Sequence, residues 1–124
     1  GNVCTVAQLR TPLLLKELEG RSDLIAKEIR ELAAHDKKKD TQYCETLYHY
    51  LTCCRSLKKT CDALFTHRNT VLYRIRRKED DFAFLLDDPA VHADLLVGVS
   101  LLLFKEKGPD FFLHTIDNND REGQ

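Results

Sequence analysis

Residues 64–77 constrain the fold of this chain more than any other stretch. Their apolar side chains recur at Val71, Leu72 and Ile75, the spacing that places them on one face of an α-helix. The opposite face is polar and rich in arginine, with Arg68, Asn69, Tyr73, Arg74, Arg76 and Arg77. Such a helix needs a core on one side and leaves a positively charged side exposed.

A second short helix is expected directly before this stretch. Ser56 is a favourable N-cap for a helix over residues 57–64, because its side-chain oxygen can accept a free backbone N–H. Only residues 65–67 separate this helix from the next one, which Thr66 can cap and which we place at about residues 67–80. Two short helices joined by so brief a turn form a helix-turn-helix.

Two longer helices are expected around this pair. Before it, Asp40 or Thr41 caps a helix with the clearest apolar stripe in the chain: Cys44, Leu47, Tyr48, Leu51 and Cys54. After it, Asp88-Pro89 starts a helix that runs to about Lys107 and stops at Gly108-Pro109. The buried stripe of this last helix comprises Val91, Leu95, Val99, Leu102 and Leu103.

The last helix is apolar over more than one face. It also carries Leu96, Leu101 and Phe104, so it must be covered on most sides, by the core with or without a second copy of the chain. Gly98 lies in its middle, where glycine costs about 1 kcal/mol relative to alanine. This glycine indicates the close approach of another helix.

The first 40 residues predict two amphipathic helices and a connection. Thr11-Pro12 opens one helix, which Gly20 closes, and Ser22 caps another that extends through Ala34. The charged residues 35–40 have no periodicity and are expected to form a linker.

The expected architecture is therefore all-α. It comprises a helical segment or linker from an upstream region at residues 1–40, a helix-turn-helix domain at residues 41–107 and a tail at residues 108–124. In the tail, the apolar residues 111–113 are expected to dock and the polar remainder to fray. The chain starts at Gly1 without Met, which favours a longer parent protein.

Charge is unevenly distributed along the chain. Residues 55–78 contain eight Lys or Arg and one acid, a net charge of +7, whereas residues 79–94 contain six acids and no Lys or Arg. The overall net charge of -1 therefore does not argue against a polyanionic partner, because the field is local.

Five cysteines at irregular spacing favour reduced thiols in a cytoplasmic protein over a disulfide framework. The apolar run at residues 95–104 is about half of what a membrane span needs, and the N-terminus lacks the pattern of a secretory leader, so no membrane association is expected.

The candidate interface residues divide by the DNA groups that each can bind. In the first turn of the proposed recognition helix, Arg68 can bind guanine and Asn69 can bind adenine. Phosphate contacts suit the cations and hydroxyls around them: Lys58, Lys59, Thr66, Thr70, Arg74 and Arg77. His67 either contacts DNA or fixes the turn, and Tyr73 either reaches a phosphate or packs on the supporting helix. A solvated basic face remains the alternative for the whole set.

Neither a metal site nor catalysis is expected. His49 and Cys53 are four residues apart on one helix, but the chain has no CxxC or HxxxH pair. It also has no glycine-rich phosphate loop or nucleophile elbow, so we expect neither an enzyme nor a bound cofactor.

Residues 63–77, followed by Leu86-Asp87-Asp88-Pro89, resemble the C-terminal DNA-binding domain of the purine-catabolism regulator (PucR) and sugar-diacid regulator (CdaR) family. The resemblance covers about residues 41–104, and its core is L-F-x-H-R-N-T-x-x-Y-R. The family signature falls on His67, Arg68, Asn69, Thr70, Tyr73 and Arg74, with Thr60 and Leu64 in the supporting helix. This chain has Arg55 where the family commonly has Gly or another turn former, and Lys78, Asp81 and Ala83 depart from its pattern after the signature.

The resemblance implies a Fis-like helix-turn-helix bundle in a bacterial transcription regulator. Members of the family act as oligomers with paired recognition helices, after a sensing region that is absent here and would bind any small-molecule effector. Our leading hypothesis is a homodimer that binds double-stranded DNA, with helix 67–80 in the major groove. The alternative is a helical interaction or dimerisation module without DNA binding.

Overall fold

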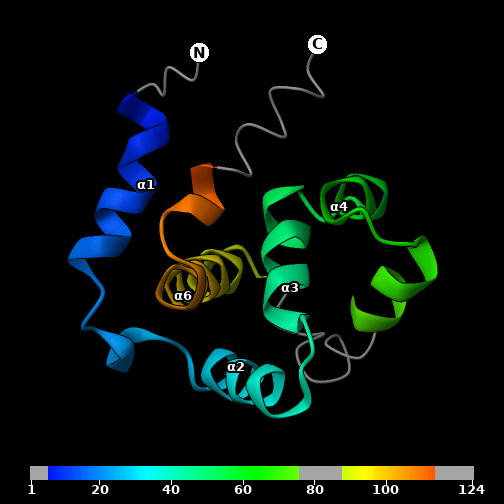
Figure 1. Ribbon diagram of the computed structural model, residues 1–124, viewed down its shortest axis with the longest axis horizontal. Helices are drawn as coiled ribbons and strands as arrows, with labels where there is room; N and C mark the ends of the chain where they lie inside the picture. Colours follow the sequence, from blue (N-terminus) through cyan, green and yellow to red (C-terminus); the bar gives the residue numbers. More distant parts are fainter. Residues whose placement is uncertain (1–5, 76–87, 114–124) are drawn as a thin grey trace.

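The structure, a computed structural model, describes residues 6–75 and 88–113 (Figure 1). The secondary structure within these ranges is helical, which confirms the all-α expectation. The elements are α1 (Val6–Glu17), the 3-10 turn η1 (Ser22–Leu24), α2 (Lys27–Lys39), α3 (Tyr43–Thr52), α4 (Leu57–Leu64) and α6 (Pro89–Lys107). Residues 68–75 and 110–113 are also helical.

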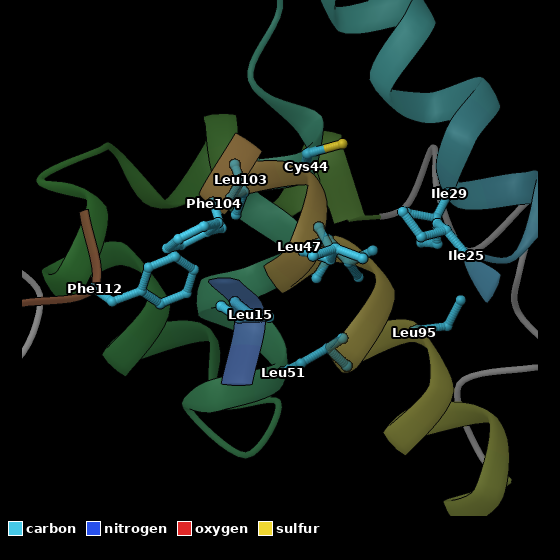
Figure 2. Close-up of a cluster of buried hydrophobic side chains, with 12 residues drawn as sticks. Leu15, Ile25, Ile29, Cys44, Leu47, Leu51, Leu95, Leu103, Phe104 and Phe112 are labelled. Carbon is cyan, nitrogen blue, oxygen red and sulfur yellow. The ribbon is translucent and has the colours of Figure 1, made fainter. Parts of the chain in front are cut away.

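α6 packs against three other helices. α1, α2 and α3 each contact it, and α3 also contacts α2 and α4 (Figure 1). Twelve of the buried side chains form one cluster, drawn in Figure 2: Leu15, Ile25, Ile29, Cys44, Leu47, Leu51, Leu95, Val99, Leu101, Leu103, Phe104 and Phe112. The N-terminal helices therefore share a core with α3 and α6. The origin of residues 1–40 in an upstream region stays a prediction.

The predicted limits of the last helix are confirmed. Asp88 is its N-cap, with Oδ1 accepting a hydrogen bond from the Ala90 N–H at 3.0 Å, and Pro89 is its first residue. Gly108 ends it with φ +78°, a conformation that glycine adopts without steric cost.

Close helix packing at Gly98 is confirmed as well. A Cβ at this buried glycine would lie 3.4 Å from Cγ2 of Ile25 and 3.9 Å from side-chain atoms of Ile29. Of the predicted stripe on α6, Leu95, Val99 and Leu103 are buried, whereas Val91 and Leu102 pack at the edge of the cluster. A Cβ would make ordinary van der Waals contact there, so α6 lies close to the segment that leads into α2 at this glycine.

The prediction for the first helix was wrong at its start. α1 includes Val6–Glu17, so Thr11 is not its N-cap and Pro12 lies inside it. A proline in a helix interior removes one backbone hydrogen bond and costs about 3 kcal/mol. Pro12 is buried and Leu15 belongs to the core cluster, so tertiary packing holds α1 together through the proline.

The second helix and the linker after it also differ from the prediction. Ser22 begins the 3-10 turn, whereas α2 starts at Lys27 and continues to Lys39, through most of the predicted linker. The three lysines of the last turn complement the negative end of the helix dipole, which supports this extension. Asp40 ends α2 in the left-handed conformation, with φ +54°.

The N-terminus of α3 is capped from another helix. Neither Asp40 nor Thr41 caps it, contrary to the prediction; the carboxylate of Asp36 on α2 accepts hydrogen bonds from the backbone N–H groups of Tyr43 at 2.9 Å and Cys44 at 2.8 Å. Thr41 donates its hydroxyl to the same carboxylate. A negative charge here also stabilises the positive end of the α3 dipole.

Aromatic side chains seal the other end of the core. Phe112 is buried against Phe104 and Tyr48, with ring centroids 6.2 Å and 5.7 Å apart, which confirms that residues 111–113 dock. The fraying predicted for the rest of the tail lies outside the described residues. His49 is buried beside the rings of Tyr48 and Phe111, and desolvation lowers its pKa from 6.5 to about 4.

The turn between α3 and α4 holds two residues in the left-handed conformation. Cys54 has φ +56° and Arg55 has φ +61°. The N–H of Arg55 donates to the Tyr50 carbonyl and that of Cys54 to the Leu51 carbonyl, the hydrogen-bond pattern of a Schellman motif. Cys54 occupies the position in this motif that favours glycine, and it is exposed rather than part of the apolar stripe, contrary to the prediction.

Replacing Cys54 with glycine should stabilise the fold. The Cys54→Gly variant removes the Cβ that disfavours the left-handed conformation, and we expect the free energy of unfolding in urea to rise by about 1 kcal/mol. Cys54→Ala keeps the Cβ and serves as the matched control, for which no such gain is expected. Equal stabilities of the two variants would contradict this account of the turn.

Acid should destabilise the fold through His49. Because its pKa is about 4 when folded and near 6.5 when unfolded, the unfolded state takes up a proton first as the pH falls. The stability that neutral His49 contributes is fully present above pH 6.5 and is lost as the pH falls towards 4, by about 3 kcal/mol in total. Urea unfolding of the wild type and His49→Phe across this range measures the difference. A stability difference between the two proteins that does not change with pH would contradict this account of His49.

Candidate nucleic-acid interface

α4 and the helix that begins at Arg68 form the predicted helix-turn-helix. α4 spans Leu57–Leu64, and Ser56 caps it by accepting a hydrogen bond from the Lys59 N–H at 3.3 Å, as the sequence predicted. The next helix is described through Ile75, so its predicted continuation to about residue 80 lies outside the described residues. In Figure 1 the pair lies on the side of α3 away from α1.

His67, rather than Thr66, caps the second helix. The Nδ1 atom of His67 accepts a hydrogen bond from the Asn69 N–H at 3.1 Å, whereas the hydroxyl of Thr66 donates back to the Leu64 carbonyl at 2.9 Å. Since Nδ1 accepts, the proton of the neutral ring is on Nε2. His67 therefore fixes the turn, one of the two roles that the sequence left open, while its side chain remains exposed.

The second helix is held in place by its buried face. Val71 and Ile75 are buried, as the spacing predicted, whereas Leu72 is half-buried. These apolar contacts position the first turn of the helix, so that Arg68, Asn69 and Thr70 point their side chains to solvent.

A long-range hydrogen bond adds to this apolar anchor. A guanidinium nitrogen of Arg74 donates to Oγ1 of Thr46 on α3 at 3.2 Å. Thr46 is fully buried, and its hydroxyl in turn donates to the Gln42 carbonyl at 2.8 Å. Both hydrogen-bonding capacities of this buried hydroxyl are thereby used, and α3 is tied to the middle of the second helix.

One protein family matches the region that contains this geometry. Residues 43–101 match the PucR C-terminal helix-turn-helix domain. This segment is therefore similar to that domain. The match runs from α3 into α6 and leaves α1 and α2 outside it. No curated protein and no solved structure matched the chain.

The matched segment, residues 43–101, presents most of the predicted interface residues at its surface. Seven of them are exposed: Lys58, Lys59, His67, Arg68, Asn69, Thr70 and Tyr73. Thr66 and Arg74 are half-buried, and each makes a hydrogen bond within the fold. Arg77 lies outside the described residues. The structure thus gathers the candidate set on α4, the turn and the first turns of the second helix.

The exposed charge of this region is predominantly positive. Among residues 55–75, four exposed Lys or Arg side chains, Arg55, Lys58, Lys59 and Arg68, stand against the single exposed acid Asp62. Positive charge concentrated on one surface raises the local concentration of a polyanion. Within the described part of the chain, no group of three His, Cys, Asp or Glu side chains could hold a metal ion. None of the described helices is long and apolar enough to cross a membrane.

The supporting roles of two residues, Thr46 and Asp36, were not predicted from the sequence. Thr46 falls beside the apolar stripe of α3, which signals burial, but its partner Arg74 is 28 residues away. Asp36 was assigned to a linker although it caps α3. Spacing rules apply within one element and could not identify partners on another.

Removing the Thr46 hydroxyl should loosen the second helix. Thr46→Val keeps the side-chain shape but deprives Arg74 of its acceptor, so we expect a loss of about 1–2 kcal/mol in the free energy of unfolding. Thr52→Val is the matched control on the same helix, because the exposed Thr52 hydroxyl donates to the carbonyls of Tyr48 and His49 in its own helix. A cost no greater than that of Thr52→Val in urea titrations would show that the Arg74 contact contributes no stability.

Proposed function

We propose that this chain binds double-stranded DNA and acts in the transcription regulation of a bacterium, with the helix that begins at Arg68 in the major groove. The observation that carries the proposal is the exposed first turn of that helix, held by buried Val71 and Ile75. The similarity of residues 43–101 to the PucR C-terminal helix-turn-helix domain supports the regulatory role. A regulator of this kind works in the cytoplasm, where the bacterial chromosome lies.

Arg68 and Asn69 are the proposed base-reading residues. Both are exposed in the first turn, where a recognition helix meets base edges. A guanidinium can donate two parallel hydrogen bonds to guanine, and a carboxamide can both donate to and accept from adenine. The backbone N–H of Asn69 is already bonded to His67, which fixes the direction from which its side chain leaves the helix.

The remaining residues are proposed to position the duplex. Lys58 and Lys59 on α4, with the Thr70 hydroxyl, suit phosphate oxygens beside the groove. Arg74 uses one guanidinium nitrogen for Thr46, so its remaining donors are those available to a phosphate. Tyr73, Thr66 and Arg77 complete the proposed set. We further propose a homodimer with one recognition helix for each half-site, and an effector bound by an upstream region.

The second candidate function is a protein-interaction module without DNA binding. Exposed leucines on α1 favour it, since Leu13 and Leu14 are each 63% exposed. Titration of a random-sequence duplex at low and moderate salt separates the two candidates. Binding that weakens steeply with salt supports the DNA-binding domain, because phosphate neutralisation releases counterions. No binding at low salt would favour the interaction module.

Two substitutions at the interface should have different signatures. Arg68→Ala should cost about 1–3 kcal/mol on a duplex selected from a random pool and should relax its base preference, because a base contact is lost. Lys59→Ala should weaken binding to all sequences alike and reduce the salt slope by about 1, because a phosphate contact is lost. Fluorescence anisotropy titrations over a range of salt concentrations measure both effects.

Arg10→Ala is the matched control for these variants. Arg10 is exposed on α1, on the opposite side of the fold from α4 (Figure 1). Its removal subtracts the same charge and should leave affinity and preference nearly unchanged. If Arg68→Ala behaved like Arg10→Ala, the reading helix would be wrongly assigned.

A further inference from the structure

Phe65, in the turn of the helix-turn-helix, is the most exposed of the large hydrophobic side chains that the structure describes. Its side chain is 81% exposed, more than Leu13 or Leu14 on α1. Among the described residues, the ring contacts involve His35, Tyr43, Tyr48, His49, Phe104, Phe111 and Phe112 but do not include Phe65. The ring therefore adds nothing to the core.

The backbone of Phe65 is in the left-handed conformation. Phe65 has φ +52°, a conformation that is rare for a bulky residue and natural for glycine. The turn needs that conformation, because the N–H of Phe65 donates to Asp62 and the N–H of Thr66 donates to Cys61, as in a Schellman motif. Glycine would satisfy both hydrogen bonds without strain. A strained position holding a large exposed side chain is one from which a functional contact can be inferred.

The position of Phe65 relative to the reading helix indicates what it contacts. It lies three residues before Arg68, so the two Cα atoms are at most about 11 Å apart. The intervening His67 is exposed and caps the helix whose first turn carries Arg68 and Asn69. An aromatic side chain that leaves the turn beside this helix terminus can reach the groove that the terminus enters.

We propose that Phe65 is a specificity-determining DNA contact, which packs its ring on the C5-methyl group of a thymine in the major groove. This inference rests on the proposed function. The thymine methyl is the apolar group that base pairs display in the major groove, and phenylalanine is one of the side chains that contact it. Because the ring is neutral, its contribution adds base preference without adding to the salt dependence.

The test combines a protein variant with removal of one methyl group from the DNA. A duplex is selected from a random pool with the wild-type protein, and each thymine is replaced in turn by deoxyuridine, which lacks only the methyl group. For the wild type we expect about a fourfold loss of affinity at one position in each half-site, the value of one buried methyl-sized group. Phe65→Gly should bind the parent duplex about tenfold more weakly, should be insensitive to deoxyuridine at that position, and should keep the wild-type salt slope.

Two further measurements test whether weaker DNA binding by Phe65→Gly comes from a damaged fold. Phe65→Gly should unfold at a temperature a few degrees above that of the wild type, because glycine relieves the left-handed strain, so weaker binding would not reflect a damaged fold. Cys54→Gly makes the same replacement at the equivalent position of the other turn and should leave DNA affinity unchanged. The opposite directions of stability and affinity in Phe65→Gly distinguish a DNA contact from a structural role.

Each contrary outcome has a definite meaning. Wild-type affinity of Phe65→Gly, or an unchanged deoxyuridine penalty in this variant, overturns the inference while the proposed function stands. A loss of self-association in Phe65→Gly on sedimentation, with DNA affinity unchanged, would assign the ring to contact with a second copy and also overturns it. Absence of wild-type binding to any duplex at low salt overturns the proposed function and this inference together.

Discussion

The packing of α3 between α2, α4 and α6 is the constraint on which the rest of this structure depends. α6 contacts this helix as part of the main core, and α4 of the helix-turn-helix contacts it as well, so six of its ten residues are buried: Tyr43, Cys44, Thr46, Leu47, His49 and Leu51. A helix covered on this scale must also bury polar groups. Thr46 meets that condition by bonding Gln42 and Arg74, and His49 meets it by remaining neutral at a pKa of about 4.

The buried position of α3 also fixes the geometry of the candidate interface. Asp36 fixes the start of α3 through two backbone N–H groups, and Thr46 then ties α3 to Arg74 in the helix that begins at Arg68. Val71 and Ile75 bury the apolar face of the same helix. The surface that we propose to bind DNA needs a definite orientation, and these contacts set it from the buried side of the helix.

Both turns that flank α4 carry strain in the absence of glycine. Cys54 and Phe65 each take the left-handed position of a Schellman motif, with φ +56° and +52°. The two positions differ in what they display, because one presents a small thiol and the other a large aromatic ring. The backbone strain is therefore common to both turns, whereas the exposed apolar surface belongs only to the turn inside the helix-turn-helix.

The sequence by itself determined the features that depend on near neighbours. Ser56 and Asp88 cap their helices, Gly108 ends α6, and Gly98 marks a close helix contact, because capping and helical spacing act over a few residues. Most of the candidate surface was also predictable, since the exposure of its residues follows from the helical spacing in α4 and in the helix that begins at Arg68.

Only the tertiary structure decided the contacts between elements. It placed Asp36 at the start of α3, joined Arg74 to Thr46, held α1 together through a buried Pro12 and left the ring of Phe65 in solvent. Each of these outcomes depends on which surfaces the packed helices cover. Which surfaces are covered depends on how the apolar faces of several helices are buried together. A pattern within one helix does not determine this packing.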